Sequence, residues 1–286
     1  MRNNLKKAWV RLLDWLYLPL DKQYVLRTRN IRLIPKIKRR YGGKKAYAEW
    51  AHTIGIFQTL MYLHLEGVTE PNILDIGCGT GLVAIASEPF LQTGGHYLGI
   101  DVRRRDIDFC QSHYPKEQYS FQHLDVHNRA YAPQQTENKA RWDVRDHSQD
   151  MVMALSVWTH FNEEDAIFYF HEIDRVLKPG GKAIVTFFLL DDPSRPESIR
   201  KRKGGSLYHN ATQQDWIFDQ PSSQSRQWFH TAWAAQPEDA IGITPEALAR
   251  MGQDSALRPI RTYPGNWKEQ AGVYFQDILV FEKSDA

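Results

Sequence analysis

The sequence predicts an α/β fold in which helices cover both faces of a mostly parallel sheet. Three observations support this prediction: strand and helix patterns alternate from residue 72 onward, an apolar run ends in a glycine-rich turn, and 286 residues can form one large domain with an appendage or two small domains. Helical patterns fall near 80–91, 104–112, 163–177 and 244–251. The candidate strands are 72–76, 96–101, 119–124, 150–155, 182–189, 258–263 and 273–282.

Two further helical patterns precede the first strand. Residues 45–66 form a long one, and residues 3–18 form an amphipathic one that Pro19 ends. The amphipathic pattern has two interpretations. A basic helix with Trp9 on its apolar side can lie in a membrane interface, or it can dock on the domain as a lid with its basic side in water.

Charge divides the chain unevenly although its net charge is only +2. Residues 1–45 hold fourteen Lys and Arg against Asp14 and Asp21, a net charge of +12, whereas the remainder carries −10. The basic N-terminal 45 residues therefore meet an anionic partner or fold onto the acidic remainder of the chain. We expect residues 1–45 to be a basic N-terminal segment, and residues 46–286 to be the main domain.

The composition limits the classes to which this protein can belong. Two cysteines, Cys78 and Cys110, cannot form a disulfide framework and belong to no metal-binding spacing, which fits a reducing cytoplasm. The chain lacks an uninterrupted apolar run near the roughly 20 residues that a spanning helix needs. Arg11 and Asp14 interrupt the apolar core that a signal peptide requires. We expect a cytoplasmic protein, with peripheral contact at the inner membrane surface through residues 1–20 as the open alternative.

Two stretches interrupt the alternation. Residues 129–149 are polar and aperiodic, which predicts a surface loop. Residues 191–240 form a long insertion after the fifth strand, with a basic run at 200–203 followed by several aromatic residues. Such an insertion is typical of a functional lid, and its aromatic residues can equally form a small satellite core.

The turn at residues 75–83 (DIGCGTGLV) is the most informative segment. Gly77, Gly79 and Gly81 allow a sharp turn and let a ligand approach the main chain closely, beside Cys78. A dinucleotide fingerprint needs its third glycine at position 82, which is leucine here. Asp75 also suits an ammonium or sulfonium group better than a pyrophosphate. The turn therefore indicates S-adenosylmethionine.

Carboxylates end the next two strands. Asp101, followed by Val102, lies about 20 residues beyond the turn, where a carboxylate can accept both ribose hydroxyls of an adenosine; the alternative role is a helix N-cap. Asp125 can accept a hydrogen bond from the adenine amino group, and the N–H of Val126 can meet a ring nitrogen.

Together these residues resemble the class I S-adenosylmethionine-dependent methyltransferases, particularly bacterial members that act on small molecules. Residues 154–161 (ALSVWTHF), 172–182 (EIDRVLKPGGK) and 274–281 (YFQDILVF) are similar to later elements of that family. The resemblance implies a seven-stranded Rossmann-like sheet with an antiparallel last strand. It also implies that Asp75 and the 77–81 backbone hold the methionine portion, and that the carbonyl of Leu155 or Ser156 faces the sulfonium.

His160 is the candidate general base, because it follows the fourth strand on the cofactor side and imidazole titrates near neutrality. A structural role in capping or packing the next helix is an equal alternative. Weaker candidates are His230, His209, Tyr208 and Glu163. The site can also work by positioning alone.

The residues after the fourth strand limit the class of acceptor molecule. Methylases of exocyclic base amines have a Pro-Pro-aromatic turn there, which this chain lacks, so nucleic acid is disfavoured. Metal-dependent members need carboxylates at that turn, and only Asp191 and Asp192 lie near, after the fifth strand; we predict no metal.

The sequence thus favours an enzyme that transfers a methyl group from S-adenosylmethionine to a small-molecule or lipid-linked acceptor, at oxygen, with the N-terminal segment and the insertion above the acceptor. The alternative is a non-catalytic protein that keeps the cofactor fold and binds membranes. The acceptor, the methylated atom, the oligomeric state and the pathway cannot be derived from the sequence.

Overall fold

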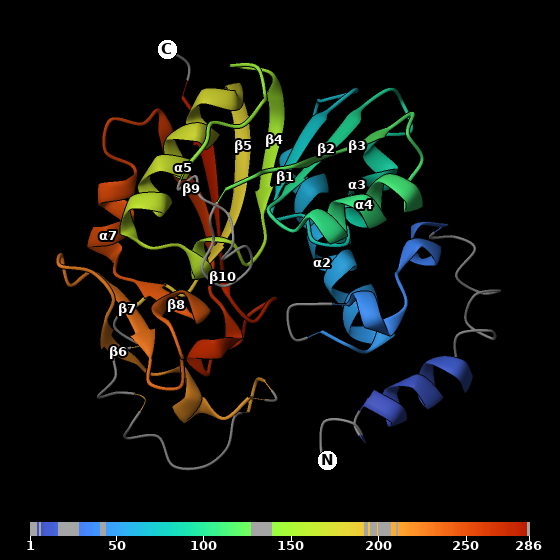
Figure 1. Cartoon of the computed structure of the whole chain (residues 1–286). Coiled ribbons are helices and arrows are strands. Elements are labelled where there is room, and N and C mark those ends of the chain that lie inside the picture. Colours follow the sequence, from blue (N-terminus) through green and yellow to red (C-terminus); the bar gives the residue numbers. More distant parts are fainter. Residues whose placement is uncertain are drawn as a thin grey trace.

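A computed structural model describes residues 5, 7–16, 29–40, 44–126, 139–191, 194, 199, 207–209 and 211–284. Its centre is a seven-stranded sheet with the strand order β3-β2-β1-β4-β5-β10-β9 (Figure 1). Strands β1 to β5 are parallel, and β10 runs antiparallel to both β5 and β9. The strands span Asn72–Ile76 (β1), His96–Asp101 (β2), Tyr119–His123 (β3), Gln149–Ala154 (β4), Leu177–Phe187 (β5), Leu257–Tyr263 (β9) and Asp277–Lys283 (β10). The predicted fold is confirmed.

Helices cover both faces of this sheet (Figure 1). Alternate residues of a strand point to opposite faces, so Ile73 joins the core beneath α2, α3 and α4, while its neighbour Leu74 joins the core beneath α5 and α7. Both side chains are fully buried, as expected of a central parallel strand. The helices span Tyr47–His64 (α2), Leu82–Ser87 (α3), Arg104–His113 (α4), Glu163–Val176 (α5) and Pro245–Met251 (α7).

Local signals explain where the helices begin and end. Asn162 caps α5 by accepting a hydrogen bond from the N–H of Asp165, and three acidic residues occupy the first turn, where they interact favourably with the helix dipole. Thr244 caps α7 in the same way, through the N–H of Ala247. Gly81 precedes α3 in the left-handed conformation, which permits the sharp entry from β1.

The insertion after β5 forms a small second sheet together with the residues that follow it. Strands β6 (Phe218–Pro221), β7 (Trp228–Thr231) and β8 (Ile241–Ile243) are antiparallel in the order β6-β7-β8. Phe188, Phe218 and Trp267 are buried together in a cluster beside this sheet. Its aromatic residues therefore form a satellite core; the basic run at 200–203 lies outside the described residues.

The polar stretch before β4 is not entirely at the surface. Trp142 and Val144 are buried against α5, in contrast to the surface loop predicted for 129–149. The cause is the polar network of Glu172 and Arg175 described below, which no periodicity reveals. Residues 127–138 of that stretch lie outside the described residues.

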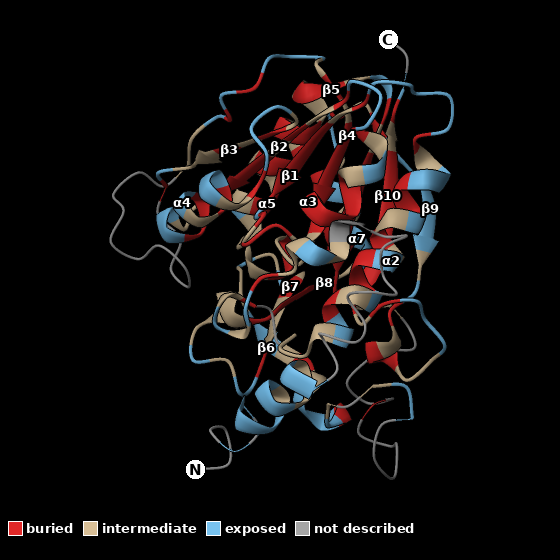
Figure 2. Ribbon diagram, turned by 90° about the vertical axis from the view of Figure 1, so that its right-hand side faces the viewer, coloured by how far each residue is buried: buried red, intermediate tan, exposed pale blue. Residues whose placement is uncertain are grey.

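The N-terminal helix, residues 7–16 with Leu5, lies apart from the sheet (Figures 1 and 2). Within the described ranges, no helix has the length and apolar character needed to cross a bilayer. The predicted division at residue 45 remains a prediction.

Candidate active site

A pocket of about 220 Å³ opens at the carboxyl ends of β1, β2 and β4. The chain proceeds from β1 outward to β2 and β3 on one side and returns to β4 on the other, so the pocket lies where the strand order reverses. Parallel sheets bind their ligands at this kind of crevice. The predicted residues that line it are Asp75, Gly77, Cys78, Gly79, Asp101, Val102, Val126, Leu155, Ser156 and His160.

The glycine turn adopts the backbone that only glycine tolerates well. Gly77, Gly79 and Gly81 have φ values of +68°, +52° and +88°. A Cβ on Gly77 would lie 2.6 Å from Cγ2 of Val157, whereas one on Gly79 would meet no atom within 4 Å. Gly79 therefore borders open space in which a ligand can approach the main chain. Gly81 packs against Tyr114 and is not part of the pocket lining.

Asp75 is a buried carboxyl with an unused oxygen. Tyr97 donates a hydrogen bond to Oδ2 at 2.5 Å, and Oδ1 has no hydrogen-bond partner among the described residues. Burial raises the pKa of Asp75 to about 8, and nearby Asp101 acts in the same direction, although the hydrogen bond from Tyr97 opposes it. A buried carboxyl with an orphaned oxygen beside a pocket fits a cationic ligand group, such as the ammonium of a methionine moiety.

Asp101 organises the turn as well as facing the pocket. Its Oδ2 accepts a hydrogen bond from the N–H of Gly79 at 2.7 Å, and its Oδ1 accepts one from the N–H of Arg103 at 2.8 Å. A carboxylate offers about four acceptor positions, so two remain for ribose hydroxyls. Burial raises the pKa of Asp101, and the two N–H donors oppose this. Asp101 therefore keeps acceptor positions for a ligand. The alternative role as a helix N-cap is wrong, because Arg103 is the N-cap residue of α4 and no side chain among the described residues caps that helix.

The two residues predicted to bind adenine, Asp125 and Val126, lie in different environments after β3. Val126 is buried and lines the pocket, next to Leu124. Asp125 is exposed and is not part of the lining. The structure therefore brings Val126 to the site and leaves Asp125 at its outside, next to residues that are not described.

Ser156 follows β4 in a left-handed conformation, with φ of +60°, which is uncommon for a residue other than glycine. Its N–H donates to Oγ1 of Thr186 at 2.7 Å, and its Oγ accepts from Nε2 of Gln276 at 2.9 Å. Thr186 in turn donates to Oε1 of Gln276. These three bonds connect β4, β5 and the start of β10, and they hold the strained residue at the edge of the pocket.

His160 lies in the same pocket and has a defined tautomer. Its Nδ1–H donates to the carbonyl oxygen of Glu238 at 2.8 Å, so Nε2 carries the lone pair of the neutral ring. Burial lowers the pKa of His160 below that of ordinary imidazole, although the Glu238 carbonyl opposes this. The sequence could not reveal this partner, because Glu238 belongs to the insertion. None of His230, His209, Tyr208 and Glu163 lines the pocket.

Aromatic residues that the sequence analysis did not select form one wall of the pocket. Trp142 stacks on Tyr169, with ring centroids 5.7 Å apart at 9°, and Phe161 also stacks on Tyr169, at 5.2 Å and 24°. Tyr169 lies on α5, and Phe161 follows β4. At these positions the sequence alone cannot distinguish an aromatic residue that lines a pocket from one that belongs to the core. The only sequence signal for Trp142 is a lone tryptophan in a polar stretch.

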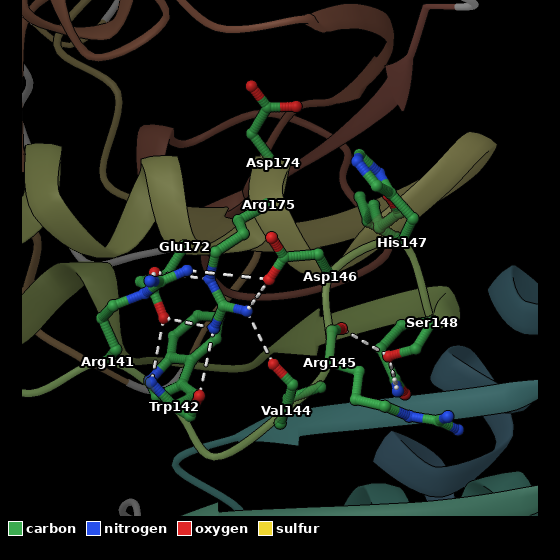
Figure 3. Close-up of polar contacts among 12 residues, drawn as sticks. Arg141, Trp142, Val144, Arg145, Asp146, His147, Ser148, Glu172, Asp174 and Arg175 are labelled. Atoms are coloured by element: carbon green, nitrogen blue, oxygen red, sulfur yellow. Dashed lines mark hydrogen bonds and ion pairs between the residues drawn. The ribbon is translucent and has the colours of Figure 1, made fainter.

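A polar network positions Trp142 (Figure 3). The N–H of Trp142 donates to Oε2 of Glu172 at 2.9 Å, and Arg175 Nη2 donates to its carbonyl oxygen at 3.1 Å. Arg175 also pairs with Glu172 and Asp146 and donates to the carbonyl of Val144. Arg175 therefore ties the segment before β4 to α5.

The remaining predicted features lie away from the pocket. Asp191 pairs with the buried Lys268 at 2.7 Å, so its carboxylate has a structural partner; Asp192 lies outside the described residues. In the part of the chain that is described, no cluster of three or more His, Cys, Asp or Glu suits a metal ion. The lining includes Lys44 of the N-terminal segment but no described residue of 191–240.

Comparison with known proteins agrees with this geometry. Residues 74–185 match the family model of a methyltransferase domain. A curated relative, the ubiquinone biosynthesis O-methyltransferase of Pelagibacter ubique, is 28% identical over 109 residues; the match spans 38% of this chain and 38% of that protein.

Solved structures share the fold at low sequence identity. Magnesium protoporphyrin IX methyltransferase of Synechocystis is 16% identical, with a TM-score of 0.51 over 92% of this chain and 100% of that one. Geranyl diphosphate C-methyltransferase of Streptomyces coelicolor is 13% identical, with a TM-score of 0.51 over 83% of this chain and 82% of that one. The predictions of a methyltransferase and of S-adenosylmethionine as its cofactor are confirmed. Residues 74–185 thus match a methyltransferase domain, and the predicted resemblance to the class I S-adenosylmethionine-dependent methyltransferases is confirmed.

Proposed function

We propose that the chain transfers a methyl group from S-adenosylmethionine to a hydroxyl oxygen of a small-molecule or lipid-linked acceptor. One observation carries the proposal: the buried carboxyl of Asp75 with its orphaned oxygen, the open main chain at Gly79 and the imidazole of His160 all border one pocket. When bound, S-adenosylmethionine supplies an electrophilic methyl group on a sulfonium. The chain must align the acceptor, exclude water and receive a proton.

Several residues fit the donor. Asp75 would pair with its ammonium group, and the backbone at 77–80 would meet the methionine portion. Asp101, with Val102, would accept the ribose hydroxyls through the lone pairs that Gly79 and Arg103 leave open. Val126 would cover the adenine, and Leu155 with Ser156 would border the sulfonium; the interaction of Asp125 with adenine remains a prediction.

His160 suits the role of general base. The Glu238 carbonyl fixes Nδ1–H, which makes Nε2 the nitrogen that can accept a proton from an acceptor hydroxyl. Burial keeps the ring neutral at physiological pH because it lowers the pKa. A base that is already neutral needs no prior loss of a proton.

The remaining lining suits an acceptor with an apolar, flat part. Phe161 and Tyr169 contribute aromatic surface next to His160. Lys44 adds positive charge at the same pocket, whereas Arg103 already pairs with Asp106. The similarity to an O-methyltransferase of ubiquinone biosynthesis supports oxygen as the methylated atom and a ring-bearing acceptor. An anionic substituent on the acceptor would pair with Lys44.

Calorimetric titration with S-adenosylmethionine tests the donor site. We expect saturable binding by the wild type and a loss of at least tenfold in affinity for Asp101→Ala, which removes two turn-shaping hydrogen bonds and the ribose acceptors. A panel of hydroxylated aromatic and lipid-linked acceptors with a methyl-tritiated donor then tests the reaction. Binding that Asp101→Ala leaves unchanged would contradict the proposed donor site.

A further inference from the structure

The N-terminal helix turns its apolar side outward. Leu5, Trp9, Leu12 and Leu16 are spaced four, three and four residues apart, so they form one stripe along the helix. All four side chains are exposed, Trp9 to 62%, and the neighbouring Trp15 is exposed to 72%. In Figure 2 this helix is mostly drawn as exposed. A single exposed leucine is ordinary, but a continuous stripe with two tryptophans marks an interaction surface.

The opposite side of the helix attaches to the body of the protein. Asp14, on the side away from Trp9, pairs with Nη1 of Arg40 at 2.8 Å. Arg40 is only 3% exposed and also donates to the carbonyl oxygens of Pro35 and Lys45. The helix is therefore held by its polar side, and its apolar side is left in solvent. A lid docked through its apolar side, the other interpretation of this pattern, requires the reverse arrangement.

Positive charge accompanies the stripe. Lys7 and Arg11 are exposed on the helix itself, and Arg32, Lys36 and Lys38 are exposed in the segment that follows. The first 45 residues contain only two acidic residues, and one of them, Asp14, is neutralised by Arg40. An apolar stripe on a helix whose opposite side carries cations matches the interface of an anionic bilayer, where acyl chains receive the apolar side chains and headgroups receive the charges.

We propose that this stripe, together with the neighbouring Trp15, docks the protein on the surface of an anionic lipid bilayer. Charge complementarity selects this occupant over a second copy of the chain, because two copies would bring two basic segments together. The docking is peripheral. Lys44, four residues beyond Arg40, lines the pocket, so the basic segment that contacts the membrane continues to the methyl-transfer site.

Vesicle flotation of the full-length chain tests the proposal. The vesicles contain phosphatidylcholine alone or phosphatidylcholine with phosphatidylglycerol in a 7:3 ratio, at low salt and at high salt. We expect retention on the anionic vesicles at low salt, and at least tenfold weaker retention by Trp9→Glu and by Leu12→Glu, because each loses an apolar side chain from the stripe. Tyr62→Glu is the matched control, since Tyr62 is 72% exposed on α2, and it should float like the wild type.

Two further measurements complete the test. Lys7→Glu combined with Arg11→Glu should abolish the preference for anionic vesicles, and a preference that survives this change would contradict the electrostatic part. Sedimentation equilibrium distinguishes self-association: a dimer that Trp9→Glu dissociates, without vesicle binding by the wild type, would overturn the proposal. Trp9→Glu should retain wild-type affinity for S-adenosylmethionine, so failure of membrane docking is separable from failure of the proposed function.

Discussion

Tyr97 donates a hydrogen bond to Oδ2 of Asp75 inside the core, while Oδ1 of the same carboxyl has no partner in the described part of the chain. The half-satisfied carboxyl keeps a proton far above the usual range of an aspartate, with a pKa of about 8. A ligand cation at this position favours the charged form. Ligand binding and loss of this proton are therefore coupled.

Affinity for S-adenosylmethionine should increase with pH up to about 8. Below the pKa of Asp75 the carboxyl is protonated, and the proton must leave before the carboxylate pairs with the donor's ammonium, which costs up to about tenfold in affinity per pH unit. Calorimetry at pH 6, 7 and 8 in two buffers of different ionisation enthalpy measures both the affinity and the protons released. Asp75→Asn should bind weakly with little pH dependence; a wild-type affinity that is constant over this range would contradict the coupling.

His160→Gln should lower kcat by roughly 10²- to 10⁴-fold if the imidazole receives the acceptor's proton. The wild-type rate should fall on the acidic side, at a pH below the ordinary imidazole value, because burial lowers the pKa and protonation removes the base. The rate of the variant should not show this fall at acidic pH, and its affinity for the donor should equal that of the wild type. Single-turnover rates across pH 5 to 8 provide the measurement.

His230→Gln is the matched control for that experiment. His230 forms a hydrogen bond with the hydroxyl of Ser222 and lies outside the pocket lining, so its substitution should leave kcat unchanged. Equal losses in both variants would indicate a general effect on the fold instead of proton transfer by His160.

Gly79→Ala should weaken donor binding in addition to the loss of stability that its strained backbone causes. The added methyl meets no protein atom within 4 Å, so it occupies the open space beside the pocket. Strain at the positive φ costs about 1–2 kcal/mol. Gly180→Ala is the control, since Gly180 has φ of +73° with equally open surroundings. Urea unfolding should give similar losses for both variants, and calorimetry should show a loss of affinity only for Gly79→Ala.

Arg175→Ala should destabilise the protein by roughly 2–4 kcal/mol, because the nearly buried carboxylate of Glu172 loses its main cation and the segment around Trp142 loses its anchor. Urea unfolding measures the loss. Arg250→Ala, which breaks the pair of an exposed arginine with Glu163, should cost less than about 1 kcal/mol. Equal losses would show that Arg175 acts only as a surface charge.

The centre of the sheet could be predicted because β1 and β2 are largely apolar runs, the first followed by Gly77 and the second ending at Asp101. Asn72–Ile76 and His96–Asp101 are observed with the expected bounds, and the helix expected at 163–177 is observed as Glu163–Val176. The fifth strand begins earlier than expected, because Leu177 already pairs with Gln149 before the register shifts and the pairing resumes at Lys182. Periodicity identifies elements whose burial is regular.

Parts of the site could not be predicted, since they depend on contacts between distant residues. Trp142 reaches the pocket through Arg175, thirty-three residues later, and the tautomer of His160 depends on Glu238, seventy-eight residues later. The outward orientation of the N-terminal stripe depends on the pair of Asp14 with Arg40. A local pattern contains no information on these partners.

The position of β10 has a consequence for biosynthesis. The last strand in chain order lies between β5 and β9, so the ribosome must release residues 277–283 before the sheet can close. Gln276, which secures Ser156, emerges immediately before that strand. A nascent chain therefore exposes an incomplete hydrophobic edge until residues 277–283 have left the ribosome, and it becomes competent for catalysis only after that.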